Sequence, residues 1–141
     1  MSLKIVYLDS GVLINAFRGV GSVGIRAIEV LDNPAYQFAT SQFVQLETIP
    51  KATYYKQQAE VDFYESFFSS VTLWATKLDE ILQTGNRIAS TYGLAAMDAL
   101  HLAAALTVDA EEFVTTEKTT KPMHRVTEIP VVSIASELLE P

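Results

Sequence analysis

Cysteine is absent from this 141-residue sequence, and histidine is scarce, with only His101 and His124. Without thiols the chain has no disulfide framework, no thiolate metal site and no cysteine nucleophile. Two histidines are too few for a histidine-rich zinc site. Any metal site must therefore draw mainly on oxygen ligands.

Long apolar runs are also missing. The longest, over 99–108, is too short to span a bilayer and contains His101. The first residues show no basic segment followed by an apolar stretch and a small-residue cleavage site, so we expect no secretion signal. We therefore expect a soluble, cytoplasmic protein that does not associate with a membrane.

Basic residues are in short supply. Ten lysines and arginines stand against seventeen acids, which gives a net charge of −7. Simple nucleic-acid binders are usually basic, so this balance argues against them. An acidic protein can still cut RNA where cations fill an acidic pocket and basic residues line its rim. The same charge suits docking of a basic segment from a partner protein.

The residues that are present predict one α/β domain over 1–141. Hydrophobic residues make up 49% of the chain, which is enough for a sizeable core. Short apolar, β-branched runs alternate with helical patterns, and this alternation predicts a three-layer α/β/α domain with a central, mainly parallel sheet of about five short strands. Strands are predicted over 4–8, 36–39, 71–73, 112–115 and 131–133. Helices are predicted over 12–17, 22–31, 41–57, 60–69, 76–92 and 97–107, with a terminal turn over 135–139.

Several of these helices have predicted N-terminal caps. Ser22 is expected to cap the second helix, and Thr40 or Ser41 the third. Thr76 followed by Asp79 resembles a capping box with aspartate at the third position. Pro50 predicts a kink within the third helix.

Four acidic residues lie at strand ends or on adjoining helices, where they could form a site. Asp9 and Glu117 follow the first and fourth strands, at the carboxyl ends where open α/β sheets bind ligands. Glu47 lies on the helix after the second strand, and Asp98 opens an almost wholly apolar helix. Each acid alone has an ordinary explanation: an Asx turn, a helix dipole or a solvated surface. Together, four clustered carboxylates repel one another and need cations, and all-oxygen ligation favours magnesium or manganese.

At these positions the sequence resembles the PIN-domain family. Four segments match the family's motifs in the family's order: 6–14 (VYLDSGVLI), 41–47 (SQFVQLE), 96–105 (AMDALHLAAA) and 113–117 (FVTTE). The resemblance implies a PIN fold with a metal-dependent phosphodiesterase site, in which Asp9, Glu47, Asp98 and Glu117 are catalytic and hold Mg²⁺ or Mn²⁺. The fourth motif usually carries Asp, often with Asp or Asn two residues later. Here Glu117 and Thr119 stand instead, which puts a second metal site in doubt.

We hypothesise that Asp9 and Asp98 anchor the metal while Glu47 and Glu117 complete or orient its water shell, so that water attacks the scissile phosphate in line. Ser10 and Thr115 are expected in supporting roles, with turn capping as their ordinary alternative. Lys118, Lys121 and Arg125 are candidates for gripping the RNA backbone, or are solvated surface charges. His101 is expected in the core or behind the ligands rather than as a general base.

For a PIN protein of this length, the resemblance implies the toxin of a toxin–antitoxin pair, of the VapC type: a homodimeric endoribonuclease held by an antitoxin protein. One alternative is a catalytically weak or inactive PIN-like domain that binds RNA or protein. A haloacid-dehalogenase-like phosphatase would need a second Asp where Gly11 stands. A receiver domain would need an acidic pair near the first strand.

Overall fold

One parallel sheet of five short strands forms the middle layer of the protein, in a computed structural model that describes residues 2–135. The strand order is β3-β2-β1-β4-β5, and every neighbouring pair is parallel. This arrangement confirms the predicted sheet. The strands are β1 (Lys4–Leu8), β2 (Tyr36–Ser41), β3 (Leu73–Ala75), β4 (Glu112–Thr115) and β5 (Val131–Ser133).

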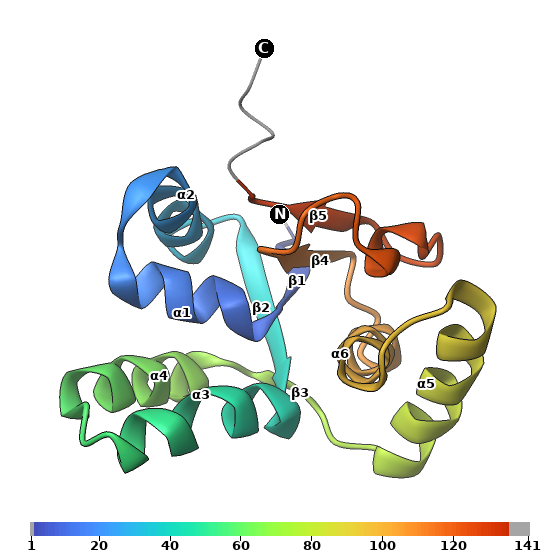
Figure 1. Cartoon of the computed structure of the whole chain (residues 1–141), viewed down its shortest axis with the longest axis horizontal. Helices are drawn as coiled ribbons and strands as arrows, with labels where there is room; N and C mark the ends of the chain where they lie inside the picture. The colour runs from blue at the N-terminus through green and yellow to red at the C-terminus, as the bar shows by residue number, and fades with distance from the viewer. Residues whose placement is uncertain (1, 136–141) are drawn as a thin grey trace.

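Helices cover both faces of this sheet (Figure 1). From β1 the chain steps outward to β2 and then β3, and it returns to β4 on the other side of β1. Because parallel crossovers are right-handed, the reversal of direction places the later helices on the opposite face. The earlier four therefore lie on one face, and α5 and α6 on the other. The elements are α1 (Ser10–Arg18), α2 (Gly21–Leu31), α3 (Gln42–Tyr54), α4 (Gln58–Ser70), α5 (Leu78–Tyr92), α6 (Ala96–Thr107) and the short 3-10 helix η1 (Pro122–Arg125).

The core lies along the central strands. Tyr7 in β1 is completely buried, and its ring stacks on that of Phe113 in β4 with 5.5 Å between ring centroids. Both faces of these strands are covered, which explains why their sequences are continuously apolar rather than alternating. The helix α6 is buried along most of its length, as its apolar sequence predicts. This packing fixes the helix that carries Asp98.

Several predicted boundaries differ from the structure: β2 runs to Ser41 instead of ending at 39, and α1 spans Ser10–Arg18 instead of 12–17. Two further boundaries are wrong for a clear physical reason. The strand predicted over 71–73 starts later, at Leu73, because α4 continues to Ser70 and the amide of Val71 donates to the carbonyl of Phe68 at its end. The helix predicted to run to position 57 ends at Tyr54, because Lys56 takes a left-handed conformation with φ of 55°.

The predicted caps are also corrected by the structure. Lys77 occupies the cap position of α5 and makes no side-chain bond there, so the capping box at Thr76 and Asp79 is absent. The second helix begins at Gly21 rather than at Ser22. Ser41 does stand at the cap of α3, but its hydroxyl bonds elsewhere. Positions 136–139 of the predicted terminal turn lie outside the described residues.

Within residues 2–135, no helix combines the length and the apolar character that crossing a bilayer requires.

Candidate metal-binding site

The candidate site lies at the carboxyl edge of the sheet, between β1 and β4. These two strands are neighbours, and the chain leaves them in opposite directions, which makes this the topological switch point where open α/β sheets bind ligands. Asp9 follows β1 directly and Glu117 follows β4 after one residue. The helices α3 and α6 begin at this same edge, because each runs antiparallel to the strands that flank it. Glu47 and Asp98 are carried there by these helices.

Asp9 is held in place by two hydrogen bonds. Its Oδ1 accepts from the backbone N–H of Ser10 at 2.9 Å, so the carboxylate caps the first turn of α1. Its Oδ2 accepts from the hydroxyl of Thr115 at 2.8 Å. The Thr115 hydroxyl in turn accepts from the N–H of Glu117 at 3.1 Å. Thr115 therefore ties the ends of β1 and β4 together and orients the Asp9 carboxylate.

Glu47 receives hydrogen bonds from two elements. The Ser10 hydroxyl donates to its Oε1 at 2.8 Å, and the Nε2 of His101 lies 2.6 Å from the same oxygen. The bond from His101, and to a lesser degree that from Ser10, lowers the pKa of the Glu47 carboxyl below its ordinary value. Glu47 is therefore ionised at neutral pH and its orientation is fixed.

A buried chain of hydrogen bonds stands behind Glu47. His101 is only 2% exposed, and its Nδ1 lies 3.2 Å from the hydroxyl of Tyr7. That hydroxyl lies 2.6 Å from the hydroxyl of Ser41. Every group is satisfied if Ser41 donates to Tyr7, Tyr7 donates to Nδ1 of His101, and the Nε2–H of His101 donates to Glu47. Burial raises the pKa of Tyr7 far above its ordinary value, so its hydroxyl keeps its proton.

His101 thus lies in the core behind Glu47, as the sequence predicted, while Tyr7 and Ser41 were missed. The sequence did contain a signal for Tyr7, because a tyrosine in the middle of a buried strand needs a partner for its hydroxyl. Nothing local identified Ser41 as that partner.

The residues present fit a divalent cation. One ligand atom each from Asp9, Glu47 and His101 lies within 4.8 Å of the others. Because His101 Nε2 is engaged with Glu47, the free ligand atoms are carboxylate oxygens. Burial raises the pKa of the Asp98 carboxyl, and the negative charges of Asp9, Glu117 and Glu47 raise it further. The cluster therefore carries uncompensated negative charge, which a cation with oxygen ligands would balance.

This repulsion gives a pH-dependent prediction for the metal-free protein. Folding raises the pKa of Asp98, so above that raised pKa its ionised form opposes folding. Asp98→Asn should raise the melting temperature at pH 7 by roughly 1–4 °C. As the pH falls through the raised pKa towards the ordinary 3.8, the wild-type carboxyl binds a proton and the difference should close. The lowered pKa of Glu47 makes folding less favourable as the pH falls, but this effect is expected in the wild type and in Asp98→Asn alike.

Thermal unfolding in chelator from pH 7.5 to pH 4 would measure this difference. A gap between variant and wild type that stays constant or widens towards acid pH would contradict the inferred repulsion.

The basic residues predicted to grip RNA lie in and after the loop that follows β4. Lys118 and Lys121 are exposed. Arg125 donates to the backbone carbonyl of Tyr92 at 3.0 Å and so ties η1 to the end of α5. The Nε2 of His124, which sequence reasoning did not single out, lies 3.2 Å from the carbonyl of Glu117 and helps to fix the loop that carries this acid. RNA contacts by the three cations stay a prediction.

Gly11 lies where a haloacid-dehalogenase-like phosphatase would need its second aspartate. A Cβ atom at this position would clash with the hydroxyl of Thr116. A side chain at position 11 would therefore require the Thr116 hydroxyl to move. Because glycine stands here, the second aspartate of the phosphatase alternative is missing.

Fold and site together define an α/β protein with carboxylates gathered at the switch point of a parallel sheet. A family model of the PIN domain matches residues 6–126. The chain belongs to the PIN-domain family. No curated protein sequence gives a significant match.

Solved structures share this fold. A chain of a toxin–antitoxin complex from Klebsiella pneumoniae aligns with a TM-score of 0.69 and 22% identity, over 92% of this chain and 97% of that one. DNA-bound VapBC from Salmonella typhimurium aligns with a TM-score of 0.68 and 16% identity, over 94% and 99%. VapBC2 from Rickettsia felis, bound to a promoter DNA fragment, gives 0.66 and 15%, over 92% and 98%. At these identities the likeness is one of fold.

Proposed function

We propose that the protein is an endoribonuclease that depends on Mg²⁺ or Mn²⁺. The observation that carries this proposal is the close grouping of Asp9, Glu47 and His101, whose ligand atoms lie within 4.8 Å of one another. Asp98 and Glu117 lie outside that group, but the charges of Asp9, Glu117 and Glu47 add to burial in raising the pKa of Asp98. A site of this kind attracts a divalent cation, and membership of the PIN-domain family supports nuclease chemistry.

In this proposal the four carboxylates have two roles, and neighbouring side chains orient two of them. Asp9 and Asp98 would hold the ion, with Glu47 and Glu117 beside it. A bound divalent ion supplies Lewis-acid activation of phosphate oxygen and of water. Ser10 and Thr115 orient the carboxylates of Glu47 and Asp9 through hydroxyl hydrogen bonds. His101 keeps Glu47 turned towards the site, because its Nε2 lies 2.6 Å from the Glu47 Oε1.

Cleavage of a mixed pool of single-stranded and structured RNA tests the proposal. With the purified protein, we expect cleavage in manganese or magnesium and none in excess chelator. A pool of single-stranded DNA, tested in parallel, shows whether cleavage requires ribose rather than deoxyribose. A folded protein that binds manganese but cuts no RNA would instead support the alternative, a catalytically inactive PIN-like binding domain.

We further propose that this nuclease is a cytoplasmic toxin with an antitoxin partner and forms a homodimer. The solved neighbours are described as toxin–antitoxin or VapBC complexes, which supports the partner. Exposed apolar side chains support protein contacts on two faces: Val20 and Ile25 around the start of α2, and Leu46 with Leu78 between α3 and α5. Sedimentation of the purified chain, alone and with its antitoxin, tests both associations.

A further inference from the structure

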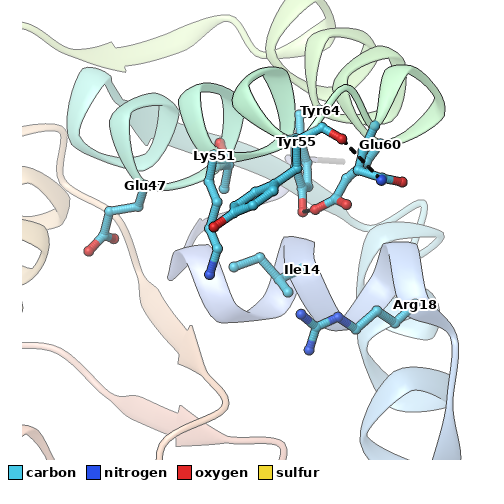
Figure 2. A pocket seen from close by; sticks show the side chains of 10 residues that line it. Ile14, Arg18, Glu47, Lys51, Tyr55, Glu60 and Tyr64 are labelled. Atoms are coloured by element: carbon cyan, nitrogen blue, oxygen red, sulfur yellow. Dashed lines mark hydrogen bonds between the residues drawn. The ribbon is translucent and has the colours of Figure 1, made fainter.

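A small pocket opens directly beside the candidate metal site, between α1, α3 and α4 (Figure 2). Glu47 lines one end of it, so the pocket continues from the acidic cluster. Its volume is about 120 Å³. This is several times the space that one water molecule needs, and a phosphate group fits within it. The lining residues used below are Ile14, Arg18, Lys51, Tyr55, Glu60 and Tyr64.

The pocket follows the register of two neighbouring helices. Ser10 in α1 and Glu47 in α3 are joined by a hydrogen bond at the metal site. Lys51 lies one helical turn after Glu47, about 6 Å further along its helix, and Arg18 lies two turns after Ser10. Both residues line the pocket, and Figure 2 shows the Lys51 side chain extending from α3 towards α1, with Arg18 beside α1 beyond Ile14. A strand leaving the metal site along these helices meets Lys51 first and Arg18 next.

The sign of the charge changes along this path. Neither Lys51 nor Arg18 forms a salt bridge within residues 2–135. The one acid at the far end, Glu60, accepts a hydrogen bond from Tyr64 at 2.5 Å instead of pairing with them. In a protein with a net charge of −7, two unpaired cations beside the acidic cluster provide a local anion site.

Aromatic rings lie next to these cations. Tyr55 lines the pocket and is 60% exposed, and Tyr54 beside it is 77% exposed, with 5.0 Å between the two ring centroids. Exposed tyrosines next to basic residues are the features on which unpaired bases stack while the backbone is held by charge. A base within a duplex is already stacked and does not offer its face.

We propose that this pocket binds the phosphate backbone of single-stranded RNA beside the bond to be cut, through Lys51 and Arg18, with a neighbouring unpaired base on Tyr55. The inference rests on the proposed function, since it assigns the substrate strand of the same site. Lys51 and Arg18 are positioning residues, because they hold the strand and do not touch the reacting atoms.

Binding of a short fluorescent single-stranded RNA to the Asp98→Asn protein tests the proposal without requiring cleavage. Lys51→Gln and Arg18→Gln should each weaken binding about fivefold to tenfold at low salt. Each should also reduce the slope of log affinity against log salt by about 0.7, the value for one phosphate contact on a single strand. Tyr55→Ala should weaken binding about fivefold and reduce the preference for single strands over duplex, while Tyr55→Phe should retain both.

Lys77→Gln is the matched control, because Lys77 is an exposed lysine outside this pocket. If Lys51→Gln and Arg18→Gln bind RNA like Lys77→Gln, the proposal is overturned. Equal competition by an acidic peptide would assign the pocket to a protein partner and also overturn it. Failure of the wild-type protein to cut RNA, with these binding effects intact, would instead remove the proposed function and leave an RNA-binding surface.

Discussion

Replacing Asp98 with asparagine should reduce metal-dependent RNA cleavage by more than about 100-fold, since even residues that only support metal ligands typically cost 10- to 100-fold when removed. Asp98 sits in the first turn of α6, half-buried, and the charges of Asp9, Glu47 and Glu117 all act on it. Asparagine keeps the shape of the side chain but removes one negative charge from the cluster. The site should then bind manganese weakly.

The measurement compares initial cleavage rates and the rise in melting temperature that manganese produces. Asp109→Asn is the control, because Asp109 is an exposed aspartate beyond the other end of the same helix and asparagine tolerates its left-handed conformation. It should retain full activity. Retention of wild-type rates and of manganese stabilisation in Asp98→Asn would show that the acidic cluster is not the nuclease site.

The second large effect is expected at His101, which touches no substrate in the proposed mechanism. His101→Leu removes the donor that holds Glu47 and takes away one of the two hydrogen-bond partners of the Tyr7 hydroxyl, leaving only Ser41. Activity should fall by about 10- to 100-fold, as for other residues that orient metal ligands. The apparent affinity for manganese should fall with it, because Glu47 is then free to turn away from the site.

His101→Gln separates positioning from packing, because its amide can donate to Glu47 from nearly the same place as Nε2. We expect it to recover much of the activity and of the manganese affinity. Tyr7→Phe, which removes only a hydroxyl, should have a smaller effect than His101→Leu. If His101→Gln is as impaired as His101→Leu while both melt at the same temperature, His101 does more than hold Glu47.

The sheet could be predicted because its strands are short, apolar and β-branched, and the bounds of β4 and β5 agree with prediction to the residue. The error at β3 has a physical cause. Val71 and Thr72 have strand-forming side chains, but the Val71 amide is taken by the last turn of α4. A local pattern does not show which of two neighbouring elements will use a backbone N–H.

Those parts of the site that depend only on the order of strands and helices along the sequence could be predicted. Asp9 and Glu117 could be placed because the carboxyl ends of parallel strands share an edge. The hydrogen bonds of His101 were not predictable, because they depend on the rotation of α6 against β1 and β2. Lys51 and Arg18 were missed for a similar reason, since they converge only through the packing of α1 against α3.

The distances along the chain that the site bridges have a consequence for folding. Thr115 and Asp9, joined by a hydrogen bond, are 106 residues apart, and His101 and Glu47 are 54 apart. Contacts between such remote segments are slow to form, because the chain loses conformational entropy on closing the loop before these contacts can stabilise it. No isolated segment carries the complete constellation. During refolding, the proposed nuclease activity should therefore return only when β4 pairs with β1, and partly folded forms should not cut RNA.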